Sequence, residues 1–347
     1  MMSKKFTFPF FVAEISANHS GSYSRAKKLI KLAKESGADA VKLQTFKPET
    51  MTLNSNKKYF KIREGLWKGN NLWKLYEKAQ TPYQWHKALF QYAKKIGIKC
   101  FSTPFDETAV EFLETLKCPI YKIASFEMQD LPLIKKVAQT KKPIIISTGM
   151  AKLNEIEAVY NYAIRNGAKK IALLYCVSNY PSKISDFNLN NIKILKKKFD
   201  CPIGLSDHSQ DDQVAFSAVS AGAQIIEKHI ALGKQKKGLD IEFSLKGKDI
   251  KRFSSKIELA KKLLGKDYFY RAKSEDKSKK FRRSIFAVEN ISKGEKFSKN
   301  NIKKIRPGNG LSPIYYNKIL NKNSPTKIYK GEPLTKKKLK GIKIKFS

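Results

Sequence analysis

The sequence predicts an α/β protein, a TIM (β/α)8 barrel followed by a small β-rich domain. Three observations favour this fold class. Short apolar, β-branched runs alternate eight times with amphipathic helical stretches over about 260 residues. No G-x-G-x-x-G or Walker sequence follows a predicted strand, which argues against the open nucleotide-binding sheets. Near the carboxyl end this alternation gives way to a short repeat that contains turn glycines.

Apolar runs bounded by turn residues define the strands of the predicted barrel. The eight expected strands are Phe10–Ser16, Ala40–Phe46, Lys99–Phe105, Ile120–Ser125, Pro143–Thr148, Ile171–Val177, Ile203–Asp207 and Gln224–Ile230. Apolar residues at spacings of three and four predict helices between them, including Tyr23–Ser36, Leu153–Asn166, Asp212–Ala221 and Lys248–Leu264. The segment Lys47–Gln80 is long for a βα loop, so we expect it to form a lid or wall over a functional site.

The sequence changes character after Leu264, which predicts domain boundaries. Residues 1–264 form the expected catalytic barrel, residues 265–281 a polar linker, and residues 282–347 the small domain. Within that domain, Lys293–Lys299 is echoed by Lys330–Lys336, and an apolar residue follows each copy, Ile302 and Leu339. Two matching strand–turn units predict a small pseudo-symmetric β domain, which we expect to be marginally stable alone and to pack on a barrel.

Composition excludes several classes of protein. Hydrophobic residues make up 41% and aromatic residues 11% of the chain, enough for a sizeable core. No apolar run reaches the roughly 20 residues of a membrane helix. The stretch Phe6–Val12 resembles a signal peptide, but Glu14 follows at once, so we expect a first strand and a cytoplasmic protein. Lysines are scattered, so the net charge of +40 does not indicate specific nucleic-acid binding, although a noncatalytic basic binding protein is an alternative.

The cysteines and the strand ends indicate different roles. The four cysteines form no CxxC pair, which predicts free thiols in a reducing cytosol. Polar residues follow every predicted strand, at the barrel face where TIM barrels carry their active sites. These strand-end residues are Glu14, Asn18, His19, Lys42, Gln44, Ser102, Thr103, Lys122, Ser125, Glu127, Ser147, Thr148, Ser178, Tyr180, Ser206, Asp207, His208, Lys228 and His229.

Two lysines in apolar strands indicate an anion site. An unpaired buried ammonium is costly, so Lys42 and Lys122 require an anionic partner. A phosphate or carboxylate ligand would meet this need, and the predicted strand ends offer hydroxyl donors, Thr103, Ser125, Ser147 and Ser206. Salt bridges from the lysines to Glu14 or Glu127 are the structural alternative.

Two histidines at neighbouring strand ends predict a metal site. His208 ends the seventh strand and His229 the eighth, so both imidazoles should open into one mouth. Imidazoles with oxygen or water completing the shell suit Mn²⁺, with Mg²⁺ or Co²⁺ as alternatives. We expect His86 to serve packing, while His19 could contact substrate or support its loop.

Motifs along nearly the whole chain resemble the sialic acid synthase (NeuB-like) family. The shared segments are residues 13–15 with 18–19, 41–46, 102–106, 121–123, 147–150, 206–208 and 226–229. Arg306-Pro307-Gly308-Asn309-Gly310 resembles the family's SAF, or antifreeze-like (β-clip), domain. Ala124-Ser125-Phe126-Glu127 and residues 59–86 resemble the branch that makes pseudaminic acid. Leu239 stands where the family commonly has proline, before Asp240.

The resemblance implies a role for each matching residue. Those expected to hold phosphoenolpyruvate are Lys42, Thr103, Lys122, Ser125, Ser147 and Ser206. Those expected on the sugar side are Glu14, Gln44, Tyr180, Asp240 and Arg306. His208 and His229 would bind the metal, and Glu127 and Glu14 would be catalytic. The family also implies a domain-swapped homodimer, in which Arg306 of a second subunit reaches the sugar.

The reaction implied by the resemblance is a condensation with C–O cleavage. Phosphoenolpyruvate would attack the open-chain aldehyde 2,4-diacetamido-2,4,6-trideoxy-L-altrose through C3, water would add at C2, and phosphate would leave. The insertion, through Trp67 and Trp73, would suit the methyl and second acetamido groups of that sugar. Alternatives are an N-acetylneuraminate or legionaminic acid synthase, and a Schiff-base aldolase that uses Lys122.

Overall fold

A computed structural model describes residues 7–8, 10–266 and 268–342 of the chain. Of the apolar stretch Phe6–Val12, Phe6 and Pro9 therefore lie outside the described residues, whereas the predicted strand Phe10–Ser16 lies within them. The end of the small domain, residues 343–347, also lies outside. The chain divides into two compact units, residues 1–265 and residues 266–347. No helix among the described residues is both long and apolar enough to cross a membrane.

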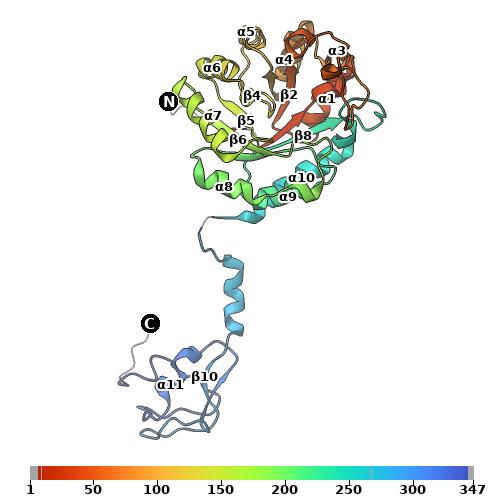
Figure 1. Ribbon diagram of the computed structural model, residues 1–347. Helices are drawn as coiled ribbons and strands as arrows, with labels where there is room; N and C mark the ends of the chain where they lie inside the picture. The colour runs from red at the N-terminus through yellow and green to blue at the C-terminus, as the bar shows by residue number, and fades with distance from the viewer. Residues whose placement is uncertain (1–6, 9, 267, 343–347) are drawn as a thin grey trace. The chain divides into compact units, whose positions relative to one another are not determined.

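The first unit is a closed barrel of eight parallel strands (Figure 1). Each strand pairs with the next along the chain, and β1 pairs with β8 to close the ring. A two-residue strand, β9 (Leu245–Lys246), adds to β8 outside the ring. The barrel strands are β1 (Phe11–Glu14), β2 (Ala40–Thr45), β3 (Lys99–Pro104), β4 (Tyr121–Ile123), β5 (Ile144–Ser147), β6 (Ile171–Cys176), β7 (Ile203–Asp207) and β8 (Ile226–Ala231).

All eight predicted strands are present, which confirms the TIM-barrel fold class. Strand bounds differ from the prediction by at most two residues, and the first strand ends at Glu14 rather than Ser16. Ser16 has a φ of 45°, outside the β region, and it begins the 3₁₀ helix η1 (Ser16–His19). This early turn brings Ser16 and Ala17 to the lining of the barrel mouth.

Helices surround the barrel, and those predicted from periodicity agree with the structure to within one residue at each end. In α1, the Ser22 hydroxyl caps the first turn by accepting a hydrogen bond from the Arg25 amide at 3.3 Å. Ala26, Leu29 and Ile30 bury the inner face of α1. The helices are α1 (Tyr23–Glu35), α4 (Tyr83–Lys95), α5 (Glu107–Thr115), α6 (Leu131–Gln139), α7 (Leu153–Arg165), α8 (Asn190–Lys198), α9 (Gln213–Ser220) and α10 (Lys248–Leu264).

The insertion after β2 is partly helical. It contains α2 (Pro48–Met51), the 3₁₀ turn η2 (Lys58–Phe60) and α3 (Leu72–Ala79) before α4 begins. Leu75 is buried, and the Phe46 ring meets the Tyr76 ring edge-on at 5.8 Å. The insertion is therefore anchored on the end of β2, next to the barrel mouth.

The second unit confirms the repeat found in the sequence. A two-stranded antiparallel sheet, β10 (Ser284–Ala287) and β11 (Ile302–Ile305), opens it, and α11 (Tyr316–Ile319) follows. Each repeat forms the same turn, in which the Glu295 carboxylate accepts from the Ser292 amide at 2.8 Å and Glu332 from Tyr329 at 2.9 Å. The equivalent apolar positions are all buried: Phe297, Ile302, Leu334 and Leu339.

The segment predicted as a plain linker contains a 3₁₀ helix, η5 (Lys273–Phe281). Apolar periodicity could not reveal this helix because its residues are exposed. Ion pairs one turn apart accompany it instead, including Lys279 with Asp276 at 2.6 Å.

A buried ion pair joins β7 and β8, and neither of its residues lines the cavity at the barrel mouth. The Lys228 Nζ lies 2.7 Å from the Asp207 Oδ2 and also donates to the Ser209 carbonyl. The second Asp207 oxygen accepts from the Ser209 amide at 2.8 Å. Both charges are fully paired, so the strand ends that carry His208 and His229 are tied together.

We predict that Lys228→Met destabilises the protein by about 3–5 kcal/mol, because the Asp207 carboxylate is then buried without its cation. Lys136→Met is the matched control, since Lys136 pairs with Glu111 on the surface at 2.5 Å and should cost about 0–1 kcal/mol. Urea unfolding measures both values. Equal losses in the two variants would contradict a structural role for the buried pair.

Candidate active site

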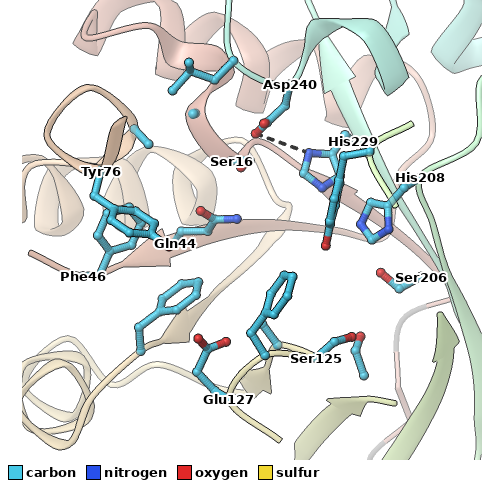
Figure 2. A pocket seen from close by; sticks show the side chains of 18 of the residues that line it. Ser16, Gln44, Phe46, Tyr76, Ser125, Glu127, Ser206, His208, His229 and Asp240 are labelled. Atoms are coloured by element: carbon cyan, nitrogen blue, oxygen red, sulfur yellow. Dashed lines mark ion pairs between the residues drawn. The ribbon is translucent and has the colours of Figure 1, made fainter. Parts of the chain in front are cut away.

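A cavity of about 400 Å³ lies at the carboxyl ends of the barrel strands. Strand ends β2, β4, β5, β6, β7 and β8 contribute to its lining, together with the insertion and the loop before β9. Predicted site residues in the lining are Lys42, Gln44, Lys122, Ser125, Glu127, Ser147, Tyr180, Ser206, His208, His229 and Asp240. The structure therefore brings eleven of the predicted residues together. Figure 2 labels, around one space, Gln44, Ser125, Glu127, Ser206, His208, His229 and Asp240.

The two predicted lysines both line the cavity, and each has polar partners. The Lys42 Nζ lies 2.6 Å from the Glu14 carboxylate and 3.1 Å from the Thr103 hydroxyl. The Lys122 Nζ donates to the Ser147 hydroxyl at 2.6 Å. Glu14 and Thr103, predicted site residues outside the lining, therefore support the site through Lys42.

Salt bridges neutralise the charges of both lysines, as in the alternative that needs no ligand, but one partner differs from the prediction. Lys42 pairs with Glu14 as expected. Lys122 pairs with Glu227 at 3.5 Å, not with Glu127. Glu227 also lies 3.7 Å from Lys42 and accepts from the Ser206 hydroxyl at 3.0 Å. The sequence reasoning missed this residue, although it stands two positions before His229 and so shares its inward face.

Burial and charge set the protonation of this cluster. Burial, opposed by Lys42, raises the pKa of Glu14 to about 7. Burial alone would also raise the pKa of Glu227, but Lys122 and Lys42 together lower it below its usual value. Burial lowers the pKa of Lys122 despite Glu227. The four side chains thus form one coupled group of two cations and two carboxyls.

His208 and His229 lie next to each other on one side of the cavity, with their rings edge-on and the ring centroids 5.3 Å apart (Figure 2). The His208 Nδ1 lies 3.3 Å from the Val177 carbonyl, which would hold the ring in the tautomer that leaves Nε2 free. The His229 Nδ1 is buried without a hydrogen-bond partner, 3.8 Å from Asp240. Burial, and then His208, lower the pKa of His229 well below its usual value, so this ring is neutral.

These imidazoles fit a divalent cation whose shell is completed from elsewhere. A neutral imidazole with an unpartnered nitrogen is the form that binds metal, and His229 has such a nitrogen, Nδ1. Across the residues that the structure describes, no three His, Cys, Asp or Glu side chains are grouped to hold a metal by themselves. Water or substrate oxygens would therefore have to complete the shell, as in open metal sites that activate substrates.

Two predicted acids lie on opposite sides of the cavity. Asp240 lies beside His229 and Ser16, whereas Figure 2 shows Glu127 across the cavity near Phe46 and Tyr76. The Glu127 Oε2 is buried without a hydrogen-bond partner. Burial raises the pKa of Glu127 to about 7, so its carboxyl can both accept and donate a proton near neutral pH.

Several strand-end residues point away from the cavity, contrary to the expected convergence. Asp207 and Lys228 form the outer ion pair, and Thr148 donates to the Leu174 carbonyl. Ser102 joins Thr45, whose hydroxyl is 2.8 Å from His86 Nε2. Side chains alternate along a strand, so only every second polar residue can enter the mouth.

The remaining predicted histidines have structural positions. His86 contacts the Pro82 carbonyl through Nδ1 and is buried, in agreement with a packing role. His19 accepts from the Gly21 amide at 3.2 Å and lies 3.2 Å from the Thr81 hydroxyl. Of the two alternatives for His19, substrate contact and support of its loop, the structure favours support of the loop.

The insertion forms the apolar wall of the cavity through Trp67 rather than Trp73. The Trp67 ring lies 5.6 Å from the Tyr180 ring, and its Nε1 donates to the Leu239 carbonyl at 2.9 Å. Trp67 lines the cavity and Trp73 does not, so of the two tryptophans only Trp67 is placed where the expected sugar contact could occur in this pocket. The asparagine cap at Asn71 starts α3 there, and the apolar face of α3 presents Leu72, Leu75 and Tyr76 instead.

Two further residues complete the description of the site. Cys176, read from the sequence only as a buried thiol, lines the cavity with its Sγ 3.7 Å from His208 Nδ1. Arg306 follows β11 in the second unit, where its side chain is exposed.

Known proteins resemble this chain over nearly its full length. The NeuB family matches residues 29–268 and the SAF domain residues 282–340. Pseudaminic acid synthase of Campylobacter jejuni subsp. jejuni serotype O:2 is 42% identical over 325 residues, 94% of this chain and 95% of the relative. Pseudaminic acid synthase of Helicobacter pylori is 43% identical over 331 residues, 94% of this chain and 96% of the relative. N,N'-diacetyllegionaminic acid synthase of the same Campylobacter strain is 38% identical over 327 residues, 93% and 97%.

Two solved structures are similar in fold to this chain. The putative spore coat polysaccharide biosynthesis protein E from Chromobacterium violaceum aligns with a TM-score of 0.80 at 26% identity, covering 96% of this chain and 100% of that one. N-acetylneuraminic acid synthetase from Leptospira borgpetersenii aligns with a TM-score of 0.71 at 29% identity, covering 80% of this chain and 94% of that one.

We predict that Glu127 makes stability depend on pH. Its pKa is raised from 4.5 to about 7, so its contribution is fully present below pH 4.5 and is lost as the pH rises through 7. The free energy of unfolding of the native protein should fall by up to about 3 kcal/mol relative to Glu127→Gln across this window. Urea unfolding of both proteins from pH 4.5 to 7.5 measures the difference, and parallel pH curves would contradict the shift.

Proposed function

The chain belongs to the NeuB family, the sialic acid synthases, and from this premise we propose that it is a pseudaminic acid synthase. It would condense phosphoenolpyruvate with 2,4-diacetamido-2,4,6-trideoxy-L-altrose and release phosphate by C–O cleavage. The family enzymes condense phosphoenolpyruvate with a sugar. One observation carries the proposal for this chain, the meeting of two buried lysines and two adjacent imidazoles in one barrel mouth.

The lysine side of the cavity is suited to the anionic substrate. Lys42 with Thr103, and Lys122 with Ser147, present ammonium and hydroxyl groups within 3.1 Å of one another. Phosphate and carboxylate oxygens accept charge-assisted hydrogen bonds from such groups. Ser125 and Ser206 would add donors, so phosphoenolpyruvate would lie over the base of the mouth with C3 directed outward.

The imidazole side is suited to the sugar aldehyde. His208 and His229 would hold a divalent cation, most simply Mn²⁺, which supplies Lewis-acid activation of the aldehyde when bound. Asp240 and Gln44 would hydrogen-bond sugar hydroxyl or acetamido groups, and Tyr180 would pack against the chain of the open sugar. The aldehyde carbon would then lie between the two halves of the cavity, within reach of C3.

The bond changes follow from this arrangement. C3 of phosphoenolpyruvate forms the new C–C bond, and the aldehyde oxygen becomes a hydroxyl on gaining a proton. Positive charge develops at C2, where water adds and loses a proton to leave a hydroxyl. The C2–O bond to the phosphate then breaks, and phosphate leaves with the bonding electrons. The C2 hydroxyl gives up its proton, which the phosphate can accept, and C2 becomes the ketone carbon of the product. Glu127, which lines the cavity and whose pKa is raised to about 7, is the group suited to these proton transfers. Glu14 would act through Lys42, with which it pairs at 2.6 Å.

Three further parts of the proposal concern the metal, the location and the assembly. The metal would be Mn²⁺, which suits imidazole and oxygen ligands, and the protein would be cytoplasmic, in keeping with its unpaired cysteines. The family resemblance implies a domain-swapped homodimer, in which Arg306 of a second subunit would contact the sugar. Arg306 is exposed in the second unit, which is compatible with contact to another subunit.

We predict that phosphate release from phosphoenolpyruvate is fastest with the 2,4-diacetamido-2,4,6-trideoxy-L-altrose aldehyde, by at least about tenfold over N-acetylmannosamine. A tenfold preference needs about 1.4 kcal/mol, within the range of one extra buried apolar group. Chelation should abolish release and Mn²⁺ should restore it. The aldehyde precursor of legionaminic acid is the second comparison, because a relative with that activity is 38% identical.

Equal or faster turnover of N-acetylmannosamine would contradict the proposed substrate. Activity that survives chelation, together with covalent labelling of Lys122 on borohydride reduction, would instead support the Schiff-base aldolase.

We predict that Trp67→Phe raises the KM for the sugar about five- to tenfold, because the hydrogen bond that fixes the insertion to Leu239 is lost. The KM for phosphoenolpyruvate should change by less than about twofold. Trp73→Phe is the same chemical change on the same insertion but outside the lining, and should alter neither KM. Steady-state kinetics with each substrate varied would reveal the difference, and equal effects of the two substitutions would refute it.

A further inference from the structure

One buried carboxylate lies where an anionic substrate would find its donors. Glu227 is 3% exposed, on β8, and its Oε1 lies 3.0 Å from the Ser206 hydroxyl, 3.5 Å from Lys122 Nζ and 3.7 Å from Lys42 Nζ. The Ser206 hydroxyl donates its proton to Glu227. Three of the groups proposed to bind phosphoenolpyruvate therefore already face a negative charge that belongs to the protein.

The other acids of the cavity do not occupy this position. Glu14 pairs with Lys42 alone at 2.6 Å, Glu127 lies across the mouth, and Asp240 lies beside His229. Among the ion pairs of the described residues, Glu227 is the carboxylate within 4 Å of both lysines. Its Oε2 is buried without a hydrogen-bond partner, so the protein does not hold Glu227 by a full set of contacts.

The charge count explains what such a residue can do. Lys42 and Lys122 carry two positive charges, and Glu14 and Glu227 balance them. Two ammonium groups without Glu227 would bind phosphate tightly, and the reaction leaves a phosphate in this place. At an effective dielectric constant of about 20, the interaction energy of two charges about 5 Å apart is larger than the free energy that corresponds to a tenfold change in affinity.

We propose that Glu227 is a positioning residue that competes with anions for Lys42, Lys122 and Ser206, and thereby lets the phosphate product leave. This inference rests on the proposed function, since it assumes that the lysine pair binds phosphoenolpyruvate. An arriving anion must displace Glu227 from its donors. A departing phosphate returns the same donors to Glu227, which keeps both ammonium groups oriented for the next substrate.

The test measures anion binding rather than activity alone. In the full chain loaded with Mn²⁺, Glu227→Gln should lower the Kd for inorganic phosphate at least about tenfold by calorimetry. It should also lower kcat, with a burst of product in the first turnover, because phosphate release becomes rate-limiting. Glu227→Asp keeps the charge but shortens the side chain, so it should keep weak phosphate binding while impairing turnover through misplaced lysines.

Glu111→Gln is the matched control, because it removes one carboxylate from an exposed pair and should leave phosphate affinity unchanged. Circular dichroism of each variant verifies folding, and Glu227→Asp provides the test if Glu227→Gln does not fold. Unchanged or weaker phosphate binding in Glu227→Gln, or tighter binding in Glu227→Asp, would overturn the inference. Failure of the proposed function has a different signature, in which the native protein neither binds phosphoenolpyruvate nor releases phosphate from it.

Discussion

The closed hydrogen bonding of β1 with β8 is the constraint on which the rest of this structure depends. In register, Ala13 lies beside Lys228 and Glu14 beside His229. Closure leaves the parallel sheet without an edge and gives each strand one face toward the barrel interior. Because all eight strands run in the same direction, their carboxyl ends meet in one mouth, and residues far apart in sequence become neighbours.

Alternation along each strand then divides the polar residues into two sets. On β8, Glu227 and His229 face the cavity, while Lys228 between them faces outward to Asp207. The outward set satisfies itself with ion pairs and hydrogen bonds. The inward set leaves several buried groups without a hydrogen-bond partner, including atoms of Glu127, Glu227 and His229. Unsatisfied buried polar groups are expensive, and their concentration in one cavity indicates a site shaped for ligands rather than for stability.

The barrel and most of the residues at its mouth can be predicted from the sequence. Apolar periodicity located every barrel strand, and the buried lysines in apolar strands marked the cavity. Periodicity does not decide which of two neighbouring polar residues at a strand end faces inward. The predicted strand-end residues therefore include Thr148 and Lys228, which do not line the cavity. It also could not distinguish Trp67 from Trp73, because that choice depends on how the insertion folds back onto Leu239. Glu227 was missed because a carboxylate beside a lysine in sequence looks like a local pair, whereas its partners come from β2 and β4.

The same reasoning explains why one-residue register matters so much in β8. A shift by one position would place Lys228 in the mouth and turn Glu227 and His229 toward the helices, since the period of a strand is two. Lys228 would then lose Asp207, and Lys122 would lose its carboxylate. The outer ion pair therefore protects the inner site against slippage, at a place where β7 and β8 carry the two adjacent imidazoles. Stability on one face of the strand and chemistry on the other are set by the same four consecutive residues, Ile226 to His229.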